Sequence, residues 1–319
     1  MSHLTILRGL PGSGKTTFAL AELKRTGNAI RVNRDELRIM LHGPDAKWSG
    51  ERERVTAAAE TAIVRDALLN KKNVIIDDTN LLGSGTARWT ELAASLATVH
   101  IEDFTKTVSI EECIARDRGR SGKARVGRGV IERMALQAGL IDLGGLNRVA
   151  IIDVDGTLSC LDHRLVYMLE PKDYEAFFGR VIHDGEFDTI VQAVNMLYNS
   201  GYYIVILSGR PASCGADTDV WLTARVPFDR LLMRQTGDHR PDGQSKADMM
   251  ELLFKSGLQK GAIKVIIDDR DSVCEVWRGL GLPLIQVDRG SAIRIEPAAL
   301  QVCIDLKIPG LHNNASQSS

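Results

Sequence analysis

The stretch "ILRGLPGSGKTTF", residues 6–18, joins a short apolar run to a glycine-rich loop and then to a helix-forming run. Its residues complete the pattern G-x-x-x-x-G-K-[ST], which binds nucleotide phosphates when it lies between a strand and a helix. The backbone N–H groups and the helix N-terminus then point at phosphate oxygens. We expect Lys15 to reach the β- and γ-phosphates and Thr16 to hold Mg²⁺. The expected nucleotide-binding residues of the loop are Gly9, Gly12, Ser13, Gly14, Lys15, Thr16 and Thr17.

The composition is that of a globular protein with two domains. The chain has 319 residues, of which 44% are hydrophobic and 25% charged, which is enough for two separate cores. No apolar stretch reaches the length of a membrane span, and the first residues are expected to form a strand rather than a signal peptide. Five scattered cysteines without a C-x-x-C pair indicate a reduced, cytoplasmic chain without structural zinc.

The net charge of −1 is divided unevenly along the chain. Residues 1–150 carry 23 Lys and Arg against 18 Asp and Glu (+5), and the remainder carries 17 against 23 (−6). A basic first half suits a polyanionic partner, and an acidic second half suits a magnesium site.

Apolar runs alternate with helical patterns along the chain, which predicts an α/β protein with two parallel-sheet, three-layer domains. The glycine-rich segment 138–147 is interpreted as a linker. We therefore expect a first domain at 1–140, a second at 148–302 and a C-terminal tail at 303–319, with a small cap between 158 and 186. Strands are expected at 4–8, 29–33, 73–77 and 98–104, and near 148–153, 203–207, 230–234, 263–268 and 283–287.

Polar residues that could act on a phosphate acceptor follow two strands of the first half. "VNRDELR", residues 32–38, places Asp35 and Arg38 one helical turn apart, so that both can face one acceptor group. "IIDDTN", residues 75–80, places Asp77 and Asp78 at a strand end, where an acid can lie beside magnesium. Each segment also has a simple structural interpretation: a helix-opening Asp with a solvated Arg, and a capping Asp-Asp-Thr.

A basic segment, "ARDRGRSGKARVGR" at 115–128, ends the first half. We interpret it as a mobile lid whose arginines clamp the transferring phosphoryl group, although basic runs are usually solvated surface. Its basic residues are Arg116, Arg118, Arg120, Lys123, Arg125 and Arg128. One aromatic residue, Trp48, could stack on a base, and a packed surface Trp is an equal alternative.

The second half carries a different chemistry. "VAIIDVDGTLS", residues 149–159, places Asp153 and Asp155 on one side of a strand end. Asp153 could attack phosphorus to form an aspartyl-phosphate, and Asp155 could protonate the leaving oxygen and later activate water. Later strand ends and one helix start are expected to converge on the same sheet edge. They contribute Ser208 and Arg210 in "ILSGR", Lys246 in "GQSKADM", and Asp268 and Asp269 in "VIIDDRDS".

These motifs together resemble a known family. The four elements of the second half are similar to the motif set of haloacid-dehalogenase-like phosphatases, and the first half resembles a P-loop kinase of the polynucleotide-kinase type. Over roughly residues 4–288, the chain resembles the bacteriophage polynucleotide kinase/3′-phosphatase family. The resemblance rests on "GLPGSGKTT", "NRDELR", "DTNL", Arg116 with Arg120, "DVDGTL", "SGR", the 242–246 segment and "IDDR".

The resemblance implies roles for individual residues. Asp35 would be the kinase general base, Arg38 would contact the terminal phosphate of the acceptor, and Arg116 with Arg120 would hold the donor phosphates. Arg164 would engage phosphate or substrate in the second half, with Asp242 a further candidate. The expected catalytic residues are Lys15, Asp35, Arg38, Arg120, Asp153, Asp155, Arg164, Ser208, Arg210 and Lys246. The expected metal ligands are Thr16, Asp78, Asp153, Asp155, Asp268 and Asp269.

The function that the resemblance implies is the healing of nucleic-acid ends in the cytoplasm of a phage host. ATP would phosphorylate 5′-OH ends, and a Mg²⁺-dependent phosphatase would remove 3′-phosphate or 2′,3′-cyclic phosphate ends of RNA or DNA. The resemblance also implies an RNA ligase acting downstream and a homo-oligomeric state.

Two alternatives stay open from the residues alone. One is a small-metabolite kinase fused to a small-molecule phosphatase, against which Arg38 and the basic segment argue. The other is a nucleotide-dependent RNA-binding module with an inert phosphatase half, against which the set of Asp153, Asp155, Lys246 and Asp268 argues.

Overall fold

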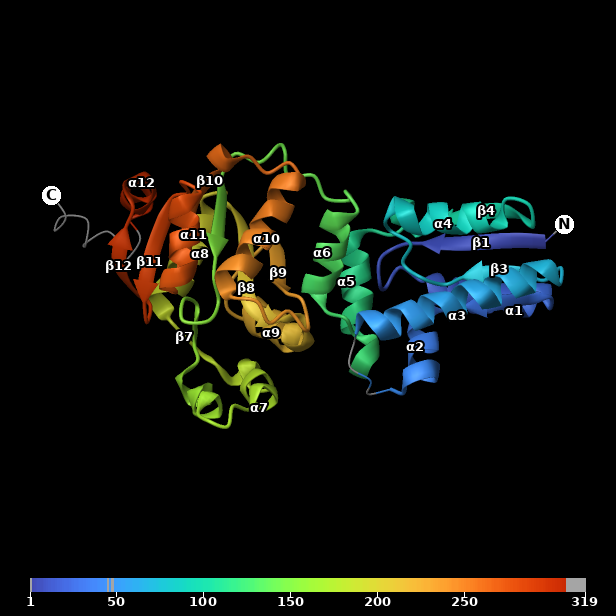
Figure 1. Cartoon of the computed structure of the whole chain (residues 1–319). Helices are drawn as coiled ribbons and strands as arrows, with labels where there is room; N and C mark the ends of the chain where they lie inside the picture. Colours follow the sequence, from blue (N-terminus) through green and yellow to red (C-terminus); the bar gives the residue numbers. More distant parts are fainter. Residues whose placement is uncertain (1, 45, 47–48, 308–319) are drawn as a thin grey trace. The chain divides into compact units, whose positions relative to one another are not determined.

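The computed structural model describes residues 2–44, 46, 49–307 of the chain (Figure 1). The chain divides into two compact units, residues 1–121 and 122–319. Trp48 and most of the predicted C-terminal tail lie outside the described residues. Among the residues that are described, no helix is both long and apolar enough to span a membrane.

The first unit is built on a four-stranded sheet in the order β2-β3-β1-β4, and all of its strand pairs are parallel. This agrees with the predicted parallel sheet, and each strand lies within one or two residues of its predicted range. The elements of this unit are β1 (Ser2–Arg8), α1 (Lys15–Thr26), β2 (Ala29–Val32), α2 (Arg34–His42), α3 (Gly50–Leu69), β3 (Asn73–Ile76), α4 (Gly83–Ala93), β4 (Ala97–Asp103), η1 (Phe104–Lys106) and α5 (Ile110–Arg118).

Alternating residues of the strands pack against helices on both faces of this sheet. Leu4 and Ile6 of β1 share a buried cluster with Val64 of α3 and Trp89 of α4. Leu7, the next residue of β1, packs instead with Ala19 of α1. Because successive side chains of a strand point to opposite faces, α3 and α4 cover one face and α1 the other. The first unit therefore has the expected three layers.

The second unit has a six-stranded sheet in the order β12-β11-β10-β5-β8-β9. Its first five strands in chain order are parallel, but β12 pairs antiparallel with β11. The parallel core agrees with the predicted fold class. Strand β12 lies in a segment for which the sequence predicted no strand, and a two-residue turn after β11 folds the chain directly back. The main elements are α6 (Arg128–Gln137), β5 (Val149–Ile152), α8 (Asp188–Asn199), β8 (Tyr203–Pro211), α9 (Gly215–Thr223), β9 (Arg230–Arg234), α10 (Asp242–Lys255), β10 (Ile263–Asp268), α11 (Asp271–Gly279), β11 (Leu284–Asp288), β12 (Ser291–Ile295) and α12 (Pro297–Leu306).

The central strand β5 is buried at all four residues, as expected for a strand covered on both faces. Ala150 and Ile152 share a core cluster with Val194 of α8 and Val302 of α12. Both helices therefore cover the same face of the sheet. Helix α12 continues to Leu306, past the predicted domain end at 302, and its Cys303 is fully buried.

Helix α6 belongs to the second unit, although the predicted first domain extends to residue 140. Strand β9 lies at the edge of the sheet and offers unpaired backbone groups there. Side chains of α6 satisfy these groups. The bonds join Arg128 Nη2 to the carbonyl of Asp229 (2.7 Å), the Leu231 N–H to Glu132 Oε2 (2.6 Å), and Arg133 Nη2 to the carbonyl of Met233 (2.6 Å). The polar face of α6 thus protects the sheet edge.

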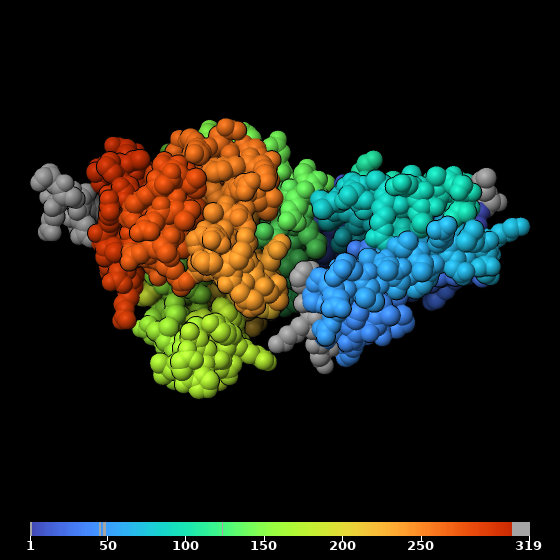
Figure 2. All heavy atoms as spheres, viewed as in Figure 1, coloured from blue at the N-terminus to red at the C-terminus, as the bar shows by residue number. Residues whose placement is uncertain are grey.

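A small lobe is inserted after β5, where the sequence predicts a cap (Figures 1 and 2). Its base is a two-stranded antiparallel pair, β6 (Ser159–Cys160) and β7 (Gly185–Glu186). Between them lie η3 (Asp162–Met168), α7 (Tyr174–Phe178) and η4 (Val181–His183). The remaining short turns of the unit are η2 (Gly122–Ala124), η5 (Ala212–Cys214) and η6 (Lys260–Ala262).

Candidate active sites

The loop between β1 and α1 has the conformation that phosphate binding requires. Gly12 and Gly14 adopt φ angles of 85° and 99°, a region that favours glycine. A Cβ at Gly12 would also lie 2.4 Å from the carbonyl oxygen of Cys113. Lys15 Nζ donates to the carbonyls of Gly9 (2.9 Å) and Leu10 (2.8 Å). Burial lowers the pKa of Lys15 to about 8. The negative charge of a bound phosphate would raise this pKa and keep the lysine protonated.

The acid beside this loop is Asp77, at the end of β3. Thr16 Oγ1 donates to Asp77 Oδ1 (3.3 Å), and Arg31 Nε donates to Asp77 Oδ2 (2.7 Å). Asp78, the predicted metal ligand, instead accepts from the backbone N–H of Arg34 (2.9 Å). Burial and the neighbouring Glu60 raise the pKa of Asp78 to about 7. The structure therefore brings Asp77, not Asp78, to the threonine expected to hold Mg²⁺.

Helix α2 carries the two residues expected to act on the acceptor. The side chain of Asn33 accepts from the N–H of Glu36 and caps the helix, which fixes where it starts. Asp35 and Arg38 form an ion pair one turn apart. Arg38 also binds both carboxylate oxygens of Glu53 (2.8 and 2.9 Å). Glu53 of α3 was missed from the sequence, since nothing local links it to Arg38.

The predicted arginine lid divides between the two units. Arg116 Nη1 lies 3.5 Å from the carbonyls of Gly12 and Ser13, so it reaches the phosphate loop. Arg120 lies just after α5, where its Nη1 is 3.8 Å from Asp117 Oδ1. Arg128 is instead held in the second unit by Glu132 (3.0 Å), because it belongs to the helix that covers β9. The side chain of Lys123 lies outside the described residues.

The second site is centred on Asp153, which follows β5. Lys246 Nζ of α10 donates to Asp153 Oδ1 (2.6 Å) and to Asp268 Oδ2 (2.7 Å). Trp277 Nε1 also donates to Asp268 Oδ2 (3.1 Å). Burial raises the pKa of Asp153 to about 8, against the charge of Lys246. These side chains come from segments far apart in the sequence and meet at the C-terminal ends of the strands.

A cation site can be built from three of these acids. One carboxylate oxygen from each of Asp153, Asp268 and Asp269 lies within 4.8 Å of the others. Burial and the charge of Asp268 raise the pKa of Asp269 to about 6. Gly156 permits this arrangement, since a Cβ there would lie 2.1 Å from Asp269 Oδ2. Three crowded carboxylates are the donor set that a hard divalent cation prefers.

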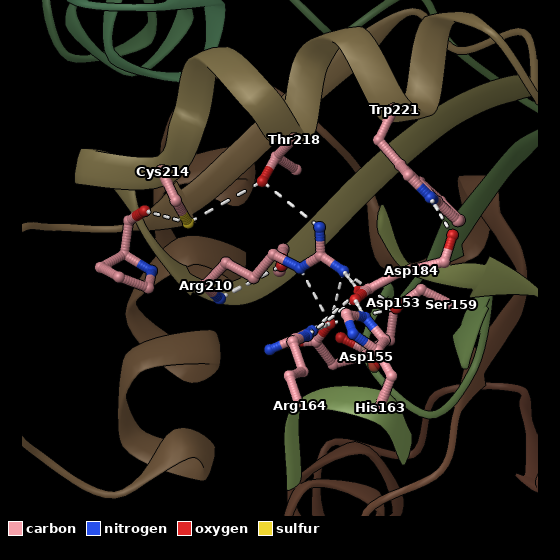
Figure 3. A network of polar contacts seen from close by, with 12 residues as sticks. Asp153, Asp155, Ser159, His163, Arg164, Asp184, Arg210, Cys214, Thr218 and Trp221 are labelled. Atoms are coloured by element: carbon pink, nitrogen blue, oxygen red, sulfur yellow. Dashed lines mark hydrogen bonds and ion pairs between the residues drawn. The ribbon is translucent and has the colours of Figure 1, made fainter. Parts of the chain in front are cut away.

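Asp155 does not share in this cluster. Its carboxylate accepts from Arg164 Nη2 (2.6 Å), Arg210 Nε (2.8 Å) and Ser159 Oγ (3.1 Å), as Figure 3 shows. Although burial opposes it, the charges of Arg210 and Arg164 lower the pKa of Asp155 to about 2. The predicted metal role of its side chain therefore differs from the observed arrangement, where two guanidinium groups bind it.

Asp184 organises this pair of arginines and was missed from the sequence. It is buried and accepts from Arg164 Nε (2.8 Å), Arg210 Nη2 (2.5 Å) and His163 Nε2 (2.8 Å). Its backbone carbonyl accepts from Trp221 Nε1 (2.8 Å). Asp184 ends the cap insertion and lies in no motif, so only the fold could reveal it.

The remaining predicted residues flank the same edge. Ser208 lies within β8 and is fully buried, and its hydroxyl accepts from the N–H of Arg210 (3.2 Å). Asp242, the first residue of α10, forms ion pairs with Arg234 and Arg270. Ser208 belongs to the SGR segment itself, and Asp242 lies beside that segment, since a Cβ at Gly209 would be 3.1 Å from Asp242 Oδ1.

Comparisons with known proteins assign each half to a family. Residues 4–140 match the model of the AAA domain. Residues 147–291 match the model described as the phosphatase domain of polynucleotide kinase PNKP. The second match covers Asp153, Ser208, Lys246 and Asp268, the residues that converge in the second site.

Solved structures similar to the chain include a chain of the Pnkp1/Rnl/Hen1 RNA repair complex. It is 28% identical, with 91% of this chain and 96% of that chain covered and a TM-score of 0.39. The APS kinase CysC of Mycobacterium tuberculosis is 19% identical (36% and 68% covered, TM-score 0.29). A predicted HAD-like hydrolase from Porphyromonas gingivalis is 15% identical (51% and 99% covered, TM-score 0.30). These scores carry no argument about the fold, which rests on the topology and on the two family models. The chain consists of an AAA-type P-loop domain followed by a phosphatase domain of the polynucleotide kinase PNKP family.

Proposed function

We propose that the protein is a bifunctional end-healing enzyme, which phosphorylates 5′-OH ends with ATP and removes 3′-phosphate ends of nucleic acids. The observation that carries this proposal is the convergence of Asp153, Lys246 and Asp268 in a domain of the PNKP phosphatase family. A separate phosphate-binding loop, with Lys15 and Thr16, occupies the other unit. Two separate sites suit the two opposite phosphate transfers that one broken strand needs.

In the phosphatase half, Asp153 is the proposed nucleophile. One of its carboxylate oxygens attacks phosphorus, the bond from phosphorus to the 3′-oxygen breaks, and an aspartyl-phosphate forms. Lys246 orients Asp153 through its 2.6 Å hydrogen bond and offers positive charge to the phosphoryl oxygens. Water then attacks the aspartyl-phosphate and releases inorganic phosphate.

Asp155 is the proposed acid and base of this reaction. With a pKa of about 2, the carboxylate bound by Arg164 and Arg210 is ionised and can act as the base toward water. To donate a proton to the leaving 3′-oxygen, the side chain must first leave the two arginines, so that its pKa rises, and take up a proton from water. A substrate phosphate that binds Arg164 or Arg210 would release it, since both anions compete for the same N–H groups.

The family implies Mg²⁺ at this site, and the residues fit it. Asp153, Asp268 and Asp269 would hold the ion, because their carboxylate oxygens already approach one another to within 4.8 Å. When bound, Mg²⁺ would neutralise charge on the phosphate and keep the neighbouring carboxyls ionised. Lys246 supplies a second positive charge, since its Nζ lies 2.6 Å from Asp153 Oδ1 and 2.7 Å from Asp268 Oδ2.

In the kinase half, the loop and Lys15 would hold the phosphates of ATP. Thr16 and Asp77 would hold its Mg²⁺, and Arg116 would contact the donor phosphates. Asp35 is the proposed base for the 5′-hydroxyl. Its side chain is 84% exposed and therefore accessible to a large acceptor. Arg38, fixed by Glu53, would bind the phosphate next to that hydroxyl.

The products of the two reactions are a 5′-phosphate and a 3′-OH. These are the ends that a nucleic-acid ligase joins, so we propose that an RNA ligase acts after this enzyme. The activity is tested with ATP, Mg²⁺ and an oligonucleotide that carries 5′-OH and 3′-phosphate. The expected product has gained the first phosphate and lost the second. Phosphorylation of sugars or other small metabolites, with the oligonucleotide unchanged, would instead favour a metabolite kinase.

A further inference from the structure

A cluster of charged side chains at the start of α10 has no part in the mechanism described above. Asp242 forms ion pairs with Arg234 on one carboxylate oxygen and with Arg270 on the other. Arg234 is the last residue of β9, and Arg270 directly precedes α11. Three segments that are distant in sequence therefore meet at this carboxylate.

The cluster adjoins the phosphatase site. Arg270 follows the two metal-binding acids directly, and its backbone N–H lies 3.3 Å from Asp268 Oδ1. Asp242 lies against the SGR segment, since a Cβ at Gly209 would be 3.1 Å from Asp242 Oδ1. Its carboxylate thus holds the Arg270 side chain beside the segment that ends at Arg210. A guanidinium group is fixed at the edge of the site.

The two arginines of the cluster differ in their exposure and in their hydrogen bonds. Arg234 is 14% exposed, and it also donates to the carbonyls of Asp238 (3.4 Å) and Arg240 (3.1 Å). It therefore ties the β9–α10 loop together. Arg270 is 56% exposed, and among the described residues its guanidinium has Asp242 as its ion-pair partner. Because an exposed ion pair contributes little to stability, structural need does not explain Arg270.

We infer that Arg270 binds the phosphodiester on the 5′ side of the nucleotide whose 3′-phosphate is removed. This inference rests on the proposed phosphatase function. With the 3′-phosphate at Asp153, the next anion of the strand is the phosphate on the 5′ oxygen of the same nucleotide. A guanidinium with free N–H groups suits such a phosphate and carries no base preference. Arg270 would make the enzyme prefer strand ends to free nucleoside 3′-phosphates.

Two substrates that differ by this one phosphate test the inference. The wild-type protein is assayed for phosphate release, with Mg²⁺, from a nucleoside 3′,5′-bisphosphate and from the matching nucleoside 3′-monophosphate. We expect kcat/KM to be about tenfold higher for the bisphosphate, because it gains one hydrogen-bonded contact between charged groups. In Arg270→Ala this preference should fall to about twofold or less, mainly through KM. Arg270→Lys keeps the positive charge but lacks the planar guanidinium with its paired N–H donors. This variant should therefore restore part of the preference for the bisphosphate.

Arg294→Ala is the matched control. Arg294 is 59% exposed and pairs with Glu296 (3.1 Å), but it lies on β12. This variant should keep the wild-type preference. Thermal unfolding of each variant shows whether the fold is intact.

The outcomes distinguish this inference from the proposed function. No release of phosphate from a 3′-phosphorylated oligonucleotide by the wild type would overturn the proposed function itself. If the oligonucleotide is dephosphorylated but Arg270→Ala lowers kcat/KM equally for both small substrates, the residue acts only through Asp242 and the inference is wrong. An unchanged preference in Arg270→Ala would also overturn it. On the oligonucleotide, Arg270→Ala should reduce the slope of log kcat/KM against log salt by about 0.7, the value for one lost phosphate contact on a single strand.

Discussion

The two sites differ in how they are built. In the first unit, the phosphate loop is one continuous segment, and the acceptor residue Asp35 lies on a surface helix with its side chain 84% exposed. In the second unit, Asp153 is 5% exposed, and its partner Lys246 lies 93 residues away. A local site tolerates the loss of one side chain with little effect on the fold. In a site of paired buried charges, the loss of one side chain affects both activity and stability, because it leaves another buried charge unpaired.

The largest expected effect is that of Asp153→Asn. Without the carboxylate nucleophile, release of the 3′-phosphate should fall by more than about 10³-fold. Phosphorylation of the 5′-end should stay within about twofold of wild type, because the P-loop site lies in the other unit. Both activities are measured on one oligonucleotide, with Asp217→Asn, an exposed residue of α9, as the control. A parallel loss of both activities in a folded variant would contradict independent sites.

The converse change is Lys15→Ala. It should lower 5′-phosphorylation by about 10²–10³-fold, since the lysine charge stabilises the transferring phosphoryl group. Release of 3′-phosphate should be unaffected. Lys24→Ala, an exposed lysine in the last turn of α1, is the matched control. Equal kinase loss in the control would mean that α1, rather than the charge at the loop, is responsible.

The same contrast explains how much the sequence could predict. The P-loop and the DVDGTL and IDDR segments are contiguous, so their residues, their strand ends and the parallel core of both sheets could be predicted. At "IIDDTN" the sequence could not decide which of Asp77 and Asp78 faces Thr16, because neighbouring residues at a strand end point in different directions. The structure assigns that position to Asp77.

Residues that lie outside any motif and act across long separations could not be predicted. Asp184 binds Arg210, 26 residues away, and Glu132 binds the N–H of Leu231, 99 residues away. Neither lies in a motif, and an isolated acid in a helix or loop is usually solvated surface. Helix α6 lies inside the predicted first domain and inside the 4–140 family match, yet its polar side chains bond to the backbone around β9 in the second unit. Burial, not local pattern, identifies these residues.

Glu132 gives a smaller and purely structural effect. In Glu132→Ala, the Leu231 N–H at the sheet edge and the guanidinium of Arg128 lose their partner. The second unit should be destabilised by about 2–3 kcal/mol, seen by calorimetry as a lower transition for that unit. Glu275→Ala, at an exposed position of α11, should change stability by less than about 0.5 kcal/mol. If the two variants were equally stable, α6 would contribute nothing to the sheet edge.

The smallest effect concerns Mg²⁺ in the absence of nucleotide, where the two sites should again differ. The second unit offers three carboxylates within 4.8 Å of one another, whereas the P-loop presents Thr16 with Asp77. Mg²⁺ at ten times its dissociation constant should stabilise the second unit by about 1.4 kcal/mol, or about 2–4 °C. The first unit should respond only when ATP is added. In Asp269→Asn the shift of the second unit should disappear, because one of three charged ligands is lost. Persistence of the shift in Asp269→Asn would place the cation elsewhere, since two remaining acids, already bound by Lys246, are a poor site for a divalent ion.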